Sequence, residues 1–246
     1  MDRLGWMGLA ALILGGAPTV VLANVGLQFA PAAHAGALFP GVMPLVVAVL
    51  AAAILKEAFT LQKKAGFALI AGGVAGIVWG NGGAIGTAQN IGHLFFIGAA
   101  AAFACYTIAM RLARLDGLHA AALSAVGSML IYLPPYALLA GDRLFDASAN
   151  AIALQALVQG LLTAVVSYVV YGRAIGLLGA SSGAAFAASC PVMTALMAIP
   201  ILGEWPSTTD WMAIVAISIG VYFISGGPFP RRAVRHDLVD GGHRSA

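Results

Sequence analysis

Eight apolar runs, each long enough to cross a lipid bilayer, divide this chain of 246 residues. To within a few residues they cover 5–28, 36–55, 65–82, 92–112, 120–141, 154–177, 183–202 and 210–227. A bilayer core about 30 Å thick is crossed by a helix of about 20 apolar residues. Only 9% of the residues are charged, against about 25% in soluble domains. The sequence therefore predicts an all-α, polytopic helical membrane protein and excludes a water-soluble globule.

Basic residues gather in the segments on one side of the predicted membrane. If all eight runs cross, ten Lys and Arg residues share the side of Met1, whereas Arg143 alone lies opposite and Arg173 falls inside a run. Basic residues in short loops stay in the cytoplasm. We therefore expect a multi-pass protein of the inner (plasma) membrane with both termini cytoplasmic. Because the charges are dispersed, the expected partner is the lipid bilayer and not nucleic acid.

The first run also resembles a secretory signal, because Arg3 precedes an apolar stretch and Ala33-His34-Ala35 has the form of a cleavage site. The apolar stretch from 4 to 29 is longer than the roughly 7 to 15 residues of a signal peptide. We therefore expect a membrane helix here.

The sequence repeats itself at a shift of 147 positions, which aligns the first three runs with the last three. The matched residues include Gly36 with Gly183, Phe39 with Phe186, Pro44 with Pro191, Glu57 with Glu204 and Gly73 with Gly220. If the eight runs alternate across the bilayer, Glu57 and Glu204 lie on opposite sides, so the two copies are inverted. Inverted repeats are typical of secondary transporters, whose sites lie near the bilayer midplane.

Residues 32–74 and 179–221 resemble the EamA-type repeat of the drug/metabolite transporter superfamily. In that pattern a Pro-containing helix ends in a Leu-Gly-Glu turn, present here at 202–204 and altered to Leu-Lys-Glu at 55–57. The resemblance implies ten helices in two halves of five. We therefore expect an incomplete first repeat of three helices (1–85), lacking the first two of the ten, a complete second repeat (91–227) and a disordered cytoplasmic tail (228–246).

A polar stripe marks the run at 154–177. It consists of residues spaced by four, with Tyr168 beside them: Gln155, Gln159, Thr163, Ser167 and Tyr171. Such a spacing keeps side chains near one face of a helix. We interpret this face as a wall of a substrate path. The alternative is hydrogen bonding between helices, worth roughly 0.6 kcal/mol per bond.

Other candidates for substrate binding lie on neighbouring runs. Asn24 and Gln28 share the spacing of four, and Asn24 is the repeat mate of Tyr171. Tyr106 and Ser189 are further candidates.

Two prolines that match in the repeat, Pro44 and Pro191, are interpreted as hinge or substrate-site residues, because proline removes a backbone hydrogen bond. Gly72, Gly76 and Gly80 predict a close helix contact. A homodimer face at these glycines is an alternative.

Charged residues are almost absent from the interiors of the runs. Glu57 and Glu204 end their runs. We interpret them as helix-end anchors or gates in preference to substrate ligands. No carboxylate lies in the middle of a run, which argues against proton coupling through such a group. His34 and His93 fall near the non-cytoplasmic ends, and the sequence shows no partner that would make either catalytic.

An enzyme is the weaker alternative. The segment around Ser181 and Ser182 superficially resembles a serine nucleophile motif, but no histidine is placed as its base. Cys105 and Cys190 lack metal-site spacing, and there is no Walker A motif, so we expect no cofactor and no metal.

These observations favour a secondary transporter that moves small metabolites or drugs, amino acids among them, by alternating access. Export is what the family resemblance implies. A truncated, non-transporting fragment or an assembly subunit is the other alternative.

Overall fold

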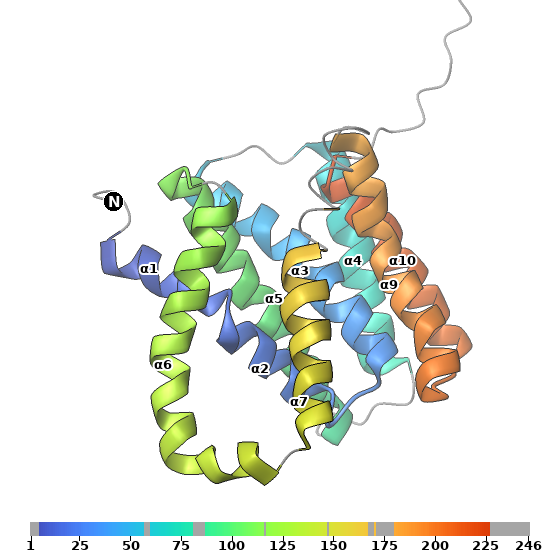
Figure 1. Ribbon diagram of the computed structural model, residues 1–246. Coiled ribbons are helices and arrows are strands. Elements are labelled where there is room, and N and C mark those ends of the chain that lie inside the picture. The colour runs from blue at the N-terminus through green and yellow to red at the C-terminus, as the bar shows by residue number, and fades with distance from the viewer. Residues whose placement is uncertain are drawn as a thin grey trace, which may run out of the picture.

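The computed structural model describes residues 5–56, 60–80, 87–115, 117–146, 148–166, 170 and 180–226. The described residues form a bundle of helices and contain no strand (Figure 1). In chain order the elements are α1 (Gly5–Leu14), α2 (Ala17–Gly26), α3 (Ala32–Ile54), α4 (Leu61–Trp79), α5 (Ala88–Ala113), α6 (Gly117–Asp146), α7 (Ala149–Gln155), the π-helix η1 (Ala156–Val166), α9 (Ala180–Leu202) and α10 (Thr208–Ile224). The prediction of an all-α fold is confirmed.

Four helices are long and apolar enough to cross a membrane by themselves: α3, α4, α5 and residues 119–139 of α6. The bent pair α1 and α2 makes a fifth span if counted as one. Shorter apolar helices cover 149–162, 186–202 and 208–224 within the part of the chain that the structure describes. Every predicted run thus contains at least one apolar helix.

The first predicted run is broken where a continuous helix over 5–28 was expected. Helices α1 and α2 meet at an angle of 40° around Gly15 and Gly16, and a proline stands in the first turn of α2. The N–H of Ala17, which has no acceptor within the helix, donates to the Ser128 hydroxyl of α6 at 3.0 Å. A residue of a distant helix therefore satisfies the free N–H group at the break, and the local sequence pattern does not reveal this contact.

The run predicted at 154–177 begins earlier and changes form. Ser148 caps α7 by accepting a hydrogen bond from the Ala151 N–H at 3.2 Å. From Ala156 the backbone continues as a π-helix of 11 residues, longer than the single turns in which this form usually occurs. Hydrogen bonds from i to i+5 alter the angular spacing on which the predicted polar face depended.

Helices α4 and α10 pack antiparallel along their lengths. A Cβ atom at Gly66 would lie 2.7 Å from the carbonyl oxygen of Gly220, and one at Gly220 would lie 2.8 Å from that of Gly66. Only glycine permits this approach. Of the glycines predicted to make a close contact, Gly76 and Gly80 do face α10, but Gly72 has open space beside it.

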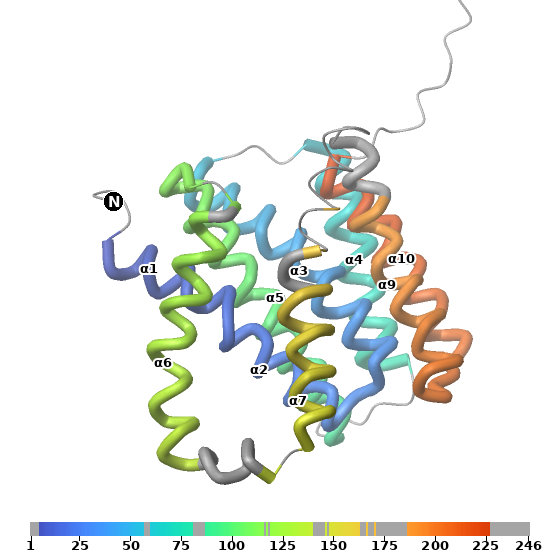
Figure 2. Tube along the Cα trace, in the orientation of Figure 1, coloured from blue at the N-terminus to red at the C-terminus, as the bar shows by residue number. Residues whose placement is uncertain are grey.

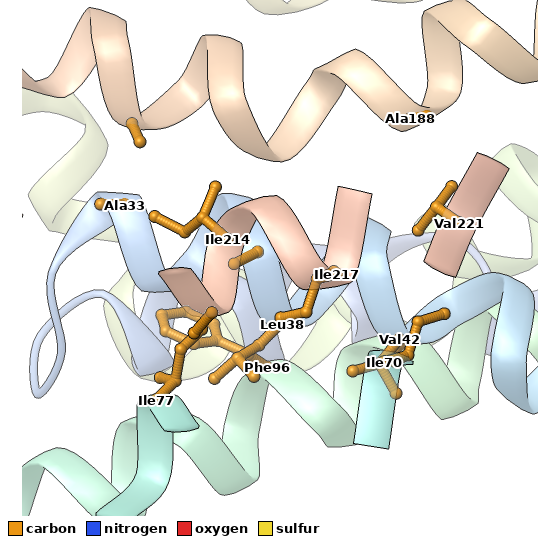
Figure 3. Packing of buried hydrophobic residues seen from close by; sticks show 14 of the residues in the cluster. Ala33, Leu38, Val42, Ile70, Ile77, Phe96, Ala188, Ile214, Ile217 and Val221 are labelled. Carbon is orange, nitrogen blue, oxygen red and sulfur yellow. The ribbon is translucent and has the colours of Figure 1, made fainter. Parts of the chain in front are cut away.

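Helix α3 occupies the centre of the bundle and packs on α5, α9 and α10 (Figure 1). Its side chains Leu38 and Val42 join Phe96 of α5 and Ile217 of α10 in the main core (Figure 3). Helix α9 runs antiparallel to α3, because Gly36 faces Thr194 whereas Gly41, further along α3, lies near Pro191.

The helices at the middle of the sequence are less enclosed. Helix α6 packs on α1 and α2, and α7 and η1 contact mainly each other (Figure 2). Their apolar side chains, such as Leu138 and Leu154, are exposed. In a membrane this surface faces lipid or further protein.

Candidate functional site

Three helices begin at the same end of the bundle, and polar side chains gather there. Helices α3, α5 and α10 contribute His34, His93 and Asp210, each within its first two turns. All three side chains are buried, with 2%, 3% and 4% of their surface exposed. Burial of polar groups at a helix end is costly unless they are paired.

The turn between α9 and α10 places Glu204 at this end. Gly203 adopts a positive φ of 70°, and its N–H donates to the Ile199 carbonyl at 3.0 Å, which closes α9. This left-handed conformation suits glycine and reverses the chain. The reversal directs Glu204 towards the start of α3.

Glu204 caps α3 from outside. Its Oε2 accepts hydrogen bonds from the N–H groups of Ala32, at 2.8 Å, and Ala33, at 3.4 Å. Pro31, which precedes the helix, provides no side-chain cap. The free N–H groups and the helix dipole both favour a negative charge here. We call this contact between Glu204 and the start of α3 the latch; it agrees with the interpretation of Glu204 as an anchor or gate.

Asp210 connects the same turn to α3. Its Oδ2 accepts from the backbone N–H of Ser207 at 3.0 Å and from the Ser207 hydroxyl at 2.8 Å, while that hydroxyl accepts from the Asp210 N–H. This capping box begins α10. The other oxygen, Oδ1, lies 3.1 Å from Nε2 of His34.

The two histidines face each other. Nδ1 of His34 lies 3.0 Å from Nε2 of His93 and 3.2 Å from the amide nitrogen of Gln89. The ring centroids of the two histidines are 5.1 Å apart. The three side chains of His93, His34 and Asp210 thus form a continuous hydrogen-bonded chain across three helices.

A cavity of about 360 Å³ lies beside this chain. It is lined by His34, Gln89, Glu204 and Asp210 together with Pro31, Ala33, Trp205, Pro206 and Ser207. Among the described residues there is no group of three His, Cys, Asp or Glu side chains arranged to hold a metal ion. The arrangement is suited to binding polar groups and to moving protons.

The structure does not gather the predicted substrate residues into one site. Asn24 and Gln28 are exposed, and the Asn24 amide donates to Val20 of its own helix at 2.8 Å. Ser189 is also exposed, and its hydroxyl donates to the Phe186 carbonyl at 2.7 Å. Two members of the predicted polar stripe are also exposed, Gln155 at the end of α7 and Gln159 on η1.

The predicted hinge residues and the predicted tyrosine lie inside the bundle. Pro191 is buried against α3, and Pro44 is half-buried. Tyr106 is half-buried on α5, where its ring packs near Gly15 and Phe103.

The remaining predicted positions fall outside the described part. These are Ser167, Tyr168, Tyr171, Glu57 and the side chains of Thr163, Ser181 and Ser182.

Sequence reasoning missed the polar chain. It left His34 and His93 without a partner, whereas each lies on the other and His34 also lies on Asp210. One local signal was available, the spacing of Ser207 and Asp210 that is typical of a capping box. The contact with His34 joins residues far apart in the sequence and has no such signal.

The model of the EamA-like transporter family matches residues 2–79 and 90–226 of the chain. No curated protein matches the chain in a sequence comparison.

Proposed function

Because the chain belongs to the EamA-like transporter family, we propose that it is a secondary transporter that exports small metabolites or drugs, amino acids among them, by alternating access. The family match confirms the resemblance to the drug/metabolite transporter superfamily, and with the apolar helices it identifies a multi-pass membrane protein. We further propose the inner membrane as its location, with both termini in the cytoplasm.

The packing of the repeat mates is the observation that carries the mechanism. Helices α3 and α9 match in the internal repeat and lie antiparallel, and so do α4 and α10. Two units that are inverted relative to each other place matching helices antiparallel. The packing therefore supports a carrier in which the two units rock against each other.

The two ends of the bundle differ in a way that fits one state of such a cycle. At the end that we place outside, the latch ties the turn after α9 to α3. At the other end, an apolar cavity of about 320 Å³ lies between the end of α3, at Leu50 and Ile54, the end of α5, and α1. We interpret this state as closed to the outside.

The substrate class is proposed from the residue types that the sequence predicts to line a path, although the structure does not gather them into one site. Apart from Pro44 and Pro191, its candidate residues are amides, hydroxyls and tyrosines, and none of them carries a charge. Such a lining suits neutral or zwitterionic molecules of modest size, which is why we place amino acids first among the substrates.

Flux through the purified chain tests the proposal. Proteoliposomes containing the chain are loaded with one unlabelled compound at a time, taken from amino acids, small amines and dyes. Uptake of the same compound in labelled form is then measured as exchange. We expect exchange of at least one compound above that of protein-free vesicles. Absence of exchange across amino acids, small amines and dyes contradicts a carrier function.

A reversible cross-link then tests alternating access. Ala32→Cys and Trp205→Cys, in a chain with Cys105→Ala and Cys190→Ala, place thiols on the two sides of the latch, and a cleavable reagent joins them. We expect the joined protein to lose exchange and to regain it after cleavage. The two single-cysteine variants are the controls. Undiminished exchange in the joined protein contradicts the mechanism.

A further inference from the structure

The hydrogen bonds of His34 fix the hydrogens of the buried polar chain. Oδ1 of the Asp210 carboxylate accepts, so Nε2 of His34, at 3.1 Å, carries a hydrogen and donates. A neutral imidazole that donates from Nε2 accepts at Nδ1. Nδ1 of His34 lies 3.0 Å from Nε2 of His93. Nε2 of His93 therefore carries a hydrogen and donates to His34.

One nitrogen atom of the three hydrogen-bonded side chains makes no hydrogen bond to any described residue. His93 is 3% exposed, and its Nδ1 has no hydrogen-bond partner among the described residues. Because Nε2 holds the hydrogen, Nδ1 holds a lone pair. A buried polar atom without a partner is destabilising, because it has lost its hydrogen bonds to water. The bundle thus keeps a proton acceptor vacant at the end of a hydrogen-bonded chain.

We infer that His93, His34 and Asp210 form a proton-binding site whose occupation releases the latch. The inference rests on the proposed transport function and adds to it the ion that is coupled to the cycle. The ligand is a proton, and the vacant atom that receives it is Nδ1 of His93.

One proton taken up at His93 is passed on by successive transfers along the hydrogen bonds to Asp210, and no other atom is gained or lost. A proton binds Nδ1 of His93, and the hydrogen on Nε2 of His93 moves to Nδ1 of His34. The hydrogen on Nε2 of His34 then moves to Oδ1 of Asp210. Both histidines end neutral, each with its hydrogen on Nδ1, and Asp210 ends as an uncharged carboxylic acid. The added charge is thereby cancelled at Asp210.

Neutralisation of Asp210 weakens the turn that carries Glu204. The bonds from Ser207 to Oδ2, at 3.0 and 2.8 Å, are made to a charged group now and to a neutral group after proton uptake. Hydrogen bonds to a charged acceptor are roughly twice as strong as neutral ones. Ser207 lies three residues after Glu204, so a looser Ser207 loosens the latch.

Few other charges surround the site. Glu204 faces it from the turn, and Gln89 of α5 is neutral. Helices α1, α2 and α9 contain no charged residue, and the two lysines of α4 lie in its first turn, at the opposite end of the antiparallel α4–α10 pair. The Glu204 carboxylate of the latch is itself ionisable, so variants of His93 and Asp210 are needed to separate its response to pH from theirs.

A distance measurement between α5, which packs on α3, and the turn that carries Glu204 tests the inference. Spin labels are attached at Leu94→Cys and Trp205→Cys, which replace side chains 70% and 79% exposed, in the full chain with Cys105→Ala and Cys190→Ala, reconstituted in lipid nanodiscs. The distance is followed by double electron–electron resonance from about pH 8 to about pH 3, a range wide enough to include histidines whose titration is shifted by burial. We expect a longer distance to appear as the pH falls. Near the midpoint the ratio of long to short distances rises up to about tenfold per pH unit, as one proton requires.

The inference predicts opposite effects of two variants on the distance between the spin labels. His93→Gln keeps a donor at the position of Nε2 but has no counterpart of Nδ1, so we expect the short distance at every pH. Asp210→Asn resembles the neutral acid, so we expect the long distance at every pH. Because the variants act on different helices, a failure of one to fold leaves the other decisive.

His119→Gln on α6 is the matched control and should leave the pH profile unchanged, because His119 is exposed. An unchanged distance in the parent chain overturns the inference, as does a pH response that survives His93→Gln. Exchange in proteoliposomes with no pH-dependent distance overturns the proton site alone. A pH-dependent distance without exchange of any compound overturns the transport proposal alone.

Discussion

Helices α3 and α9 carry matching stretches of the internal repeat, but their surroundings differ. Helix α3 lies between α5, α9 and α10, whereas α9 packs mainly on α3 and α10, within the described residues. Phe39 of α3 is half-buried and its mate Phe186 is 57% exposed. Val42 is 5% exposed, whereas its mate Ser189 is exposed. Matching stretches of sequence thus form matching helices, and the neighbouring helices decide which face of each becomes part of the core.

This difference separates two roles for one sequence pattern. The enclosed face of α3 holds the bundle together, because each side chain there has partners on other helices. The open face of α9 carries Ser189 and Cys190, and little protein contact constrains it. We expect substitutions to affect stability on α3 and exchange on α9.

The largest effect is expected where α3 meets α9. Gly36→Val introduces a branched side chain where a Cβ atom would already lie 2.4 Å from Thr194. We expect the free energy of unfolding to fall by about 3 kcal/mol, the upper part of the range for overpacking. Denaturation in detergent, followed by tryptophan fluorescence, measures the change. Gly72→Val, placed where no atom lies within 4 Å, is the control, and an equal loss there would erase the distinction.

A smaller effect separates the two phenylalanines. Phe39→Ala removes a ring that meets Phe103 edge-on, with centroids 6.5 Å apart, and should cost about 2 kcal/mol of unfolding free energy. Phe186→Ala removes an exposed ring and should cost less than about 0.5 kcal/mol. The same denaturation measurement compares the two. Equal costs would mean that α9 is as enclosed as α3.

A polar substitution sharpens the comparison further. Val42→Ser buries a hydroxyl in the core and should lower the free energy of unfolding by about 1 kcal/mol. Ser189→Val removes a hydroxyl that bonds its own helix and should leave stability unchanged within about 0.5 kcal/mol. If Ser189 lines the substrate path, Ser189→Val alters the exchange rate in proteoliposomes. A stable variant with unaltered exchange removes Ser189 from the proposed path.

The mildest test is chemical labelling. Cys190 is exposed, whereas its repeat mate Met43 is half-buried. With Cys105→Ala in both chains, we expect N-ethylmaleimide to modify Cys190 about tenfold faster than the thiol introduced by Met43→Cys with Cys190→Ala, because thiol reactivity follows exposure. Mass spectrometry gives the two rates. A charged maleimide adds a second contrast, since it reacts only if water reaches this face.

Local sequence patterns predicted where the helices lie in the sequence. The features that depend on contacts between distant residues were not predicted. Apolar runs place each helix, because about 20 apolar residues are what a bilayer requires. The break at Gly15 and Gly16 was missed because Ser128, more than a hundred residues away, completes it. The chain of His34, His93 and Asp210 was missed for the same reason: three helix starts must meet before any of these side chains has a partner.

The latch has a consequence for biosynthesis. Glu204 and Ala32 are 172 residues apart, so the ribosome has made the chain through the end of α9 before the start of α3 receives its cap. Until then two N–H groups in the first turn of a central helix have no acceptor from the protein and depend on water or lipid head groups. The turn after α9 therefore completes the start of α3, and a nascent chain released before Glu204 leaves that start without its cap.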